Sequence, residues 1–93
     1  VQNKIPIYRA MPNTASKVGE AITCIATNTE SINPNVEECF QSIGSTNQID
    51  EELMDAATVL VACGIAYALR FIRSMVQGGI QIGFDSKTAS KIS

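Results

Sequence analysis

The sequence predicts an α/β segment over residues 1–49 and an all-α segment over residues 50–93. Before residue 50, short strand-like runs are followed by a stretch with helical spacing of its apolar residues. From residue 50 on, only helical spacing recurs. The clearest feature is the uncharged run Ala56–Leu69, which is apolar around its whole circumference if it is wound as a helix. A chain of 93 residues has a modest core of its own, so we expect a second chain to cover this helix.

The first predicted element is a short strand over Lys4–Met11. Ile5 and Ile7 share one face of this strand, and Pro6 is tolerated only at a sheet edge or near the start of a strand. The Met-Pro-Asn-Thr sequence at residues 11–14 then turns the chain into a loop.

Ala21–Thr27 is predicted as the second strand because it is rich in Ile and Thr, which favour extended backbone. Ile22, Cys24 and Ala26 lie on one of its faces, and the polar run Asn28–Ser31 ends it.

A helix is predicted to start at Pro34, with Asn33 as its N-cap and Gly44 as its stop. Ser45–Ile49 is then either a weak edge strand or a loop, because its polarity suits both. The apolar positions that define the helix are Val36, Cys39, Phe40 and Ile43.

From residue 50 the pattern predicts one long helix, capped by Asp50 and running to about Gln77. Gly64 lies inside it, so the helix is expected to bend, to break, or to let another backbone approach closely. The glycines at 78, 79 and 83 match no nucleotide-binding loop spacing and are interpreted as a helix stop. Asp85 or Ser86 caps a further helix. The apolar spacing comes from Leu53, Ala57, Leu60, Gly64, Tyr67, Phe71 and Met75.

The composition excludes some functions. The chain is 45% hydrophobic and 17% charged, against a usual ~25% charged, which favours self-association or origin within a larger protein. Val1 in place of an initiator Met favours the latter. Its net charge is −2 and no basic residue lies between Lys17 and Arg70, so we expect no nucleic-acid partner. Asp55 and Arg70 confine the apolar run to fewer than the roughly 18–20 residues that span a bilayer, so we expect no membrane segment.

Cys24, Cys39 and Cys63 form an odd count without C-x-x-C spacing, and each has apolar neighbours. They are expected to be small, buried, reduced residues of a cytoplasmic protein. The chain has no histidine, which excludes Ser-His and Cys-His nucleophile pairs and His-containing metal sites within it. No catalytic residue and no metal ligand is predicted in these 93 residues.

Met11, Pro12 and Asn13 are the candidate binding residues. A strand that ends in Met-Pro-Asn-Thr places a rigid loop and one amide side chain at its C-terminal end, where ligands of open α/β sheets lie. Taken alone, a Pro-Asn loop is usually a simple turn.

The loop has a context that resembles a known family. Arg9–Thr14, followed by Val18-Gly19-Glu20, is similar to the A-M-P-N-T-P and V-G-E-G signature of pyrroline-5-carboxylate reductases. The later matches keep the family's order, and together they extend over essentially all 93 residues. They are the helix Pro34–Gly44 with its glycine before a strand, Asp55-Ala56, Gly64, Ala66-Tyr67, and Gly78-Gly79 with Gly83.

This resemblance implies that residues 1–49 are the C-terminal part of a Rossmann-type NAD(P)-binding domain, and that residues 50–93 begin an all-helical dimerisation domain. It also implies an NADPH- or NADH-dependent reductase that acts on 1-pyrroline-5-carboxylate and forms L-proline. Met11, Pro12 and Asn13 would then line the nicotinamide end of the cofactor.

The resemblance further implies a homodimer or a higher homo-oligomer, because the helical domains of two subunits interlock in that family. Four large side chains of the long helix are therefore expected to be buried between subunits. These are Leu60, Tyr67, Phe71 and Met75.

Several departures from the family pattern leave alternatives open. The family's S-G-S-G-P-A-Y stands here as V-A-C-G-I-A-Y at residues 61–67, without either hydroxyl or the proline, and Ala15 replaces the last proline of A-M-P-N-T-P. The G-x-G-x-x-G loop is expected before Val1 and the S-P-G-G-T segment after Ser93, so the 93 residues alone are expected to be inactive. The alternatives are a related Rossmann-type dehydrogenase with a different imine or acid substrate, and a non-enzymatic paralogue that only dimerises.

Overall fold

The computed structural model describes residues 5–93, so Lys4 at the start of the first predicted strand lies outside the described residues. The chain divides into two compact units after Ala62. The first unit holds the strands, and the second, Cys63–Ser93, consists of helices. The predicted order of an α/β segment followed by an all-α segment is confirmed.

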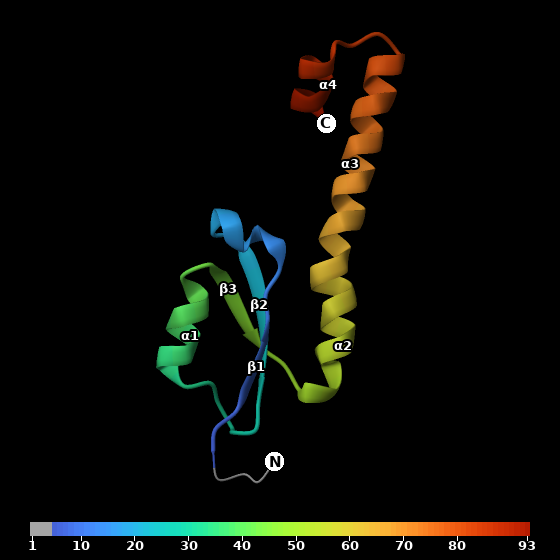
Figure 1. The fold of residues 1–93 in the computed structure, drawn as a ribbon. Helices are drawn as coiled ribbons and strands as arrows, with labels where there is room; N and C mark the ends of the chain where they lie inside the picture. Colours follow the sequence, from blue (N-terminus) through green and yellow to red (C-terminus); the bar gives the residue numbers. More distant parts are fainter. Residues whose placement is uncertain (1–4) are drawn as a thin grey trace. The chain divides into compact units, whose positions relative to one another are not determined.

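A three-stranded mixed sheet forms the basis of the first unit, with the strand order β1-β2-β3 (Figure 1). β1 (Tyr8–Met11) runs antiparallel to β2 (Ala21–Thr27), and β2 runs parallel to β3 (Gly44–Gln48). Two parallel neighbours need a crossover connection, and the helix α1 (Pro34–Gln41) supplies it. β2 is therefore the central strand.

β2 has the predicted bounds, and both of its faces contribute to the core. Thr23 and Ile25 lie on one face with no exposed surface, and Cys24 on the other face is also buried. α1 lies on one side of the sheet and α2 (Met54–Ala57) on the other (Figure 1). A strand covered on both faces lacks the simple alternation of a half-buried strand.

β1 is shorter than predicted because the chain before it bonds to a side chain instead of a strand. The N–H of Ile7 donates to Asn28 Oδ1 at 2.8 Å, and Asn28 Nδ2 donates to the carbonyl of Ile5 at 3.0 Å. Pro6, between them, has no N–H to donate to a ladder. Ile5 and Ile7 therefore lie outside the strand and are exposed.

The structure contains the predicted helix, and it decides between strand and loop for the stretch that follows it. Asn33 caps α1, since its Oδ1 accepts from the N–H of Asn35 at 2.9 Å. Residues 44–48 form β3, so the strand interpretation is correct and the loop interpretation is wrong. Polar residues suit this strand because it lies at the edge of the three described strands.

The expectation of three buried cysteines is only partly met. Cys24 is buried in the central strand, whereas Cys39 and Cys63 are exposed in this chain. Cys39 lies on α1, which has no fully buried residue. All three thiols are free.

The helical part starts less regularly than predicted. Residues Glu51–Leu53 form a 3₁₀ turn, α2 follows, and Thr58–Cys63 are wound as a π-helix. Asp50 occupies the N-cap position, as predicted, but its side chain makes no capping hydrogen bond. The helix does not break at Gly64, so that one of the expected outcomes is wrong. The winding changes there from π to α.

α3 (Gly64–Gln81) continues past the predicted stop at Gly78-Gly79. Gly79 instead provides a close contact, because a Cβ built there would lie 3.3 Å from the Cβ of Ala89 on α4 (Ser86–Ile92). The chain turns at Gly83, whose φ of 123° suits glycine.

α4 has the predicted cap. Asp85 Oδ1 accepts from the N–H of Thr88 at 3.0 Å. Hydrogen bonds from Thr88 stabilise the carboxylate and lower the pKa of Asp85 below its ordinary value of 3.8.

The helical stretch Glu51–Gln81 is long and apolar enough to cross a membrane, judged by length and composition alone. The length argument against a membrane segment is therefore wrong, because the helix continues past both Asp55 and Arg70. A helix that packs in a protein core or interface passes the same test.

Candidate functional site

The first candidate site is the loop that follows β1. Met11 ends the strand and is half-buried, Pro12 is exposed, and Asn13 begins a 3₁₀ turn over Thr14–Val18. Met11 is paired with Cys24, and β1 runs opposite to β2. The loop therefore lies at the C-terminal end of β1, as predicted, and beside the N-terminal ends of β2 and β3.

Asn13 connects this loop to the sheet. Its side-chain oxygen Oδ1 accepts from the N–H of Ile22 at 3.4 Å, and its backbone carbonyl accepts from the N–H of Ser16 at 3.2 Å. The side chain is partly exposed, and its Nδ2 donates to no protein atom in the described part of the chain. Asn13 thus has one atom that fixes the loop and one donor that is available to a ligand.

The end of the turn is fixed by backbone contacts. Gly19 has a φ of 74°, and its N–H donates to the carbonyl of Ser16 at 3.2 Å. The N–H of Glu20 donates to the carbonyl of Ala15 at 3.1 Å. The loop therefore keeps a defined shape although Ala15 stands where the similar family has proline. Its hydrogen bonds suit it to position a ligand.

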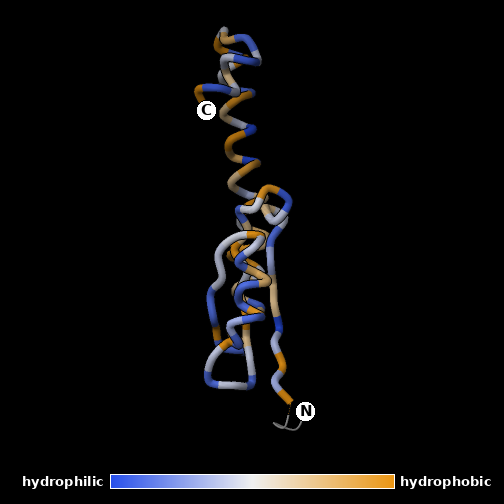
Figure 2. The backbone as a smooth tube through the Cα atoms, turned by 90° about the vertical axis from the view of Figure 1, so that its left-hand side faces the viewer, coloured by the Kyte–Doolittle hydropathy of each residue, from blue (hydrophilic) through white to orange (hydrophobic). Residues whose placement is uncertain are grey.

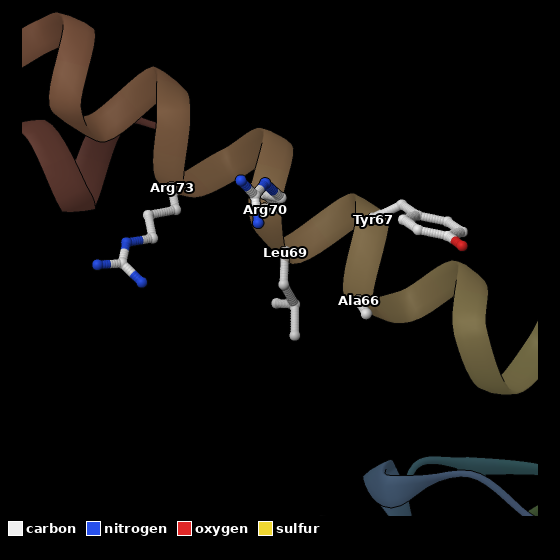
Figure 3. Close-up of a pocket in the computed structure, with 5 residues that line it drawn as sticks. All are labelled: Ala66, Tyr67, Leu69, Arg70 and Arg73. Carbon is white, nitrogen blue, oxygen red and sulfur yellow. The ribbon is translucent and has the colours of Figure 1, made fainter.

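The second unit carries a feature that the sequence reasoning missed. Arg70, Arg73, Ser74 and Gln77 line a hollow of about 320 Å³ on α3. A neighbouring hollow of about 390 Å³ is lined by the two arginines and by three further residues, Ala66, Tyr67 and Leu69. Figure 3 shows Ala66, Leu69 and Arg73 extending from the same side of α3, with Tyr67 extending to a different side.

The signal for these arginines was present in the sequence. Two guanidinium groups three residues apart on a predicted helix share a face, and no acidic residue occurs from Ala56 to Phe84.

Within residues 5–93, no group of three or more Cys, Asp or Glu side chains is arranged to hold a metal ion.

Comparisons with known proteins match one family over both units. The sequence model of the family described as "Pyrroline-5-carboxylate reductase dimerisation" matches residues 51–93. Pyrroline-5-carboxylate reductase 1 of Dictyostelium discoideum is 36% identical over 106 aligned residues, which cover 99% of this chain and 19% of that protein.

Solved structures agree in fold. A pyrroline carboxylate reductase of Plasmodium falciparum, with NADP bound, matches with a TM-score of 0.82 and 31% identity, over 92% of this chain and 36% of that one. The 1-pyrroline-5-carboxylate reductase of Streptococcus pyogenes matches with a TM-score of 0.84 and 27% identity, over 99% of this chain and 37% of that one. The chain thus spans about a fifth to a third of the length of the curated relatives it matches.

Proposed function

Because the chain belongs to the pyrroline-5-carboxylate reductase family, we propose that it is part of a reductase that moves hydride from NADPH or NADH to the C=N carbon of 1-pyrroline-5-carboxylate, which gives L-proline. The observation that carries this proposal is the agreement in sequence and fold with named reductases over 92–99% of the chain.

We propose the division into domains that the resemblance implies. Residues 1–49 belong to a Rossmann-type cofactor domain, and residues 50–93 begin a helical domain through which subunits associate. The family match from residue 51 supports the second part. Met54 is buried in the first compact unit, so the start of the helical domain also packs with the sheet.

In this proposal the loop Met11–Asn13 positions the nicotinamide end of the cofactor. A bound nicotinamide supplies the hydride, and the protein contributes orientation and electrostatics. The bond between Asn13 Oδ1 and the N–H of Ile22 holds the loop, and the free Nδ2 donor fits a carbonyl acceptor such as a carboxamide. Met11 and Pro12, which come directly before Asn13, contribute apolar surface to the same loop. The NADP in the Plasmodium falciparum structure supports a dinucleotide in this role.

Self-association is the second part of the proposed function. Leu60, Tyr67 and Phe71 are 78%, 67% and 69% exposed, and Met75 is 47% exposed. Figure 2 shows hydrophobic residues recurring on successive turns of α3. A surface of this kind marks an interaction site, and the match to a dimerisation domain supports a second copy as the partner. We also propose a cytoplasmic, reducing location, on the odd number of cysteines without C-x-x-C spacing in the sequence.

The substrate is tested with the intact protein that contains this chain. We expect turnover of 1-pyrroline-5-carboxylate with NADPH or NADH, at a kcat/KM well above that for cyclic imines with a larger or a smaller ring. A preference for another imine or acid would support the alternative dehydrogenase, which the changed segment at residues 61–67 leaves open. A protein that binds no dinucleotide, measured by fluorescence titration, would support the non-enzymatic paralogue.

The role of Asn13 is tested by Asn13→Ala in the same protein. We expect kcat/KM to fall by about tenfold or more, the effect of losing one well-placed polar contact, while the unfolding midpoint changes little. Asn13→Asp is the matched control, because it keeps the acceptor for the N–H of Ile22 and removes the Nδ2 donor. If both variants keep full turnover and only Asn13→Ala is less stable, Asn13 merely fixes the turn.

A further inference from the structure

Within the second unit, Cys63–Ser93, α3 carries two arginines that are paired with no carboxylate. Arg70 and Arg73 line the 320 Å³ hollow together with Ser74 and Gln77, which are uncharged. Within the part of the chain that the structure describes, the only ion pair joins Arg9 to Glu51. Within the second unit, Cys63–Ser93, neither guanidinium group of the hollow has an acidic partner.

The charges of the sequence are divided between its two parts. Seven of the nine acidic residues lie between Glu30 and Asp55, and the stretch Cys63–Ser93 has four basic residues and one acidic residue. Two copies of such a chain attract each other when the acidic part of one meets the basic part of the other.

The acidic residues nearest the start of the helical domain match the arginines in spacing. Glu52 and Asp55 are three residues apart, as Arg70 and Arg73 are, and both are exposed. Glu51 is already paired with Arg9, which leaves these two carboxylates available. All four residues lie within the region matched by the dimerisation family.

We propose that Arg70 and Arg73 of one copy bind the carboxylates of Glu52 and Asp55 of a second copy. The proposal rests on the self-association described above and identifies the polar contacts that orient it. In a dimer with a twofold axis each contact is made twice, once from each subunit. The hollow on α3 is then a site that only the partner subunit completes.

The apolar residues beside the hollow explain why the partner must be acidic. Tyr67 and Leu69 line the adjoining hollow together with both arginines. A partner that covers these side chains also removes water from the guanidinium groups, and a buried charge without a partner is strongly destabilising. Carboxylates accept two parallel hydrogen bonds from arginine and so replace the lost water.

Charge reversal in the intact protein tests the contact. Arg70→Glu/Arg73→Glu is expected to raise the dimer dissociation constant by roughly tenfold or more, because it places like charges opposite each other. Adding Glu52→Arg/Asp55→Arg to the same chain is expected to restore most of the affinity. Sedimentation velocity over a dilution series measures both. Lys87→Glu/Lys91→Glu on α4 is the matched control and is expected to leave the dissociation constant unchanged.

A neutral variant keeps the test decisive if a reversed variant fails to fold. Arg70→Gln/Arg73→Gln is expected to weaken the dimer and to reduce the dependence of its dissociation constant on salt. An unchanged dissociation constant and an unchanged salt dependence in this variant would overturn the proposal. The proposal would also be overturned if adding Glu52→Arg/Asp55→Arg to Arg70→Glu/Arg73→Glu gave no tighter dimer. Turnover is measured separately. If the dissociation constants change as expected but the protein has no reductase activity, only the enzymatic function is refuted. If the protein is an active reductase but the dissociation constants do not change, only this contact is refuted.

Discussion

Leu60→Asp is expected to convert the assembled protein to monomers at micromolar concentration. Leu60 is 78% exposed in the single chain and lies in the uncharged run of the helical region. Burying a leucine side chain contributes about 1.5–3 kcal/mol, and a carboxylate placed in the same apolar contact adds a desolvation cost. A symmetric dimer loses this contribution at both copies of the residue.

Light scattering coupled to size-exclusion chromatography measures the effect. Val18→Asp is the matched control, because Val18 is 75% exposed but lies in the 3₁₀ turn of the sheet unit, outside the dimerisation match. The control is expected to stay assembled, and both variants are expected to keep the helical circular dichroism signal. A Leu60→Asp protein that remains dimeric would show that a different face of the helix makes the contact.

The elements set by local chemistry could be predicted from the sequence. The bounds of β2 follow from its run of Ile and Thr, and the N-termini of α1 and α4 follow from Asn33 and Asp85, whose side chains cap the next turn. Capping needs only residues two or three positions away, which is why a local pattern identifies it.

The elements set by distant residues could not be predicted in this way. β1 starts late because Asn28, more than twenty residues further on, takes the hydrogen bonds of the preceding backbone. α3 continues through Gly78-Gly79 because Gly79 packs against Ala89 of the next helix. In each case a tertiary contact overrides the local preference of the residue.

The candidate site divides in the same way. The Met-Pro-Asn loop is visible in the sequence, but the bond from the N–H of Ile22 to Asn13 depends on how β1 and β2 pair. Burial of the exposed side chains of the helical part depends on a second chain. A sequence pattern indicates that such a chain is needed but does not show where it lies. Arg70 and Arg73 were recognisable only by asking which charges lacked a neighbour of opposite sign.

Gly44→Ala is expected to have the largest effect on folding. Gly44 has a φ of 149°, and an added Cβ would lie 2.5 Å from the nitrogen and 2.6 Å from the carbonyl carbon of Ala21, and closer still to its oxygen. These are backbone atoms of the buried central strand, so no side chain can move aside. The N–H of Ala21 also donates to the carbonyl of Ile43 at 2.9 Å, where β2 and β3 begin to pair.

The substitution therefore forces β3 away from β2 at its first residue. We expect a loss of about 4 kcal/mol or more, a large part of the ~5–15 kcal/mol that stabilises an ordinary domain, seen as insoluble protein or a much lower denaturation midpoint. Gly78→Ala is the control, because a Cβ there meets nothing within 4 Å, and alanine within α3 is expected to stabilise by up to ~1 kcal/mol. Equal midpoints for the two variants, measured by circular dichroism during urea unfolding, would mean that β3 can pair without the close approach of Gly44 to Ala21.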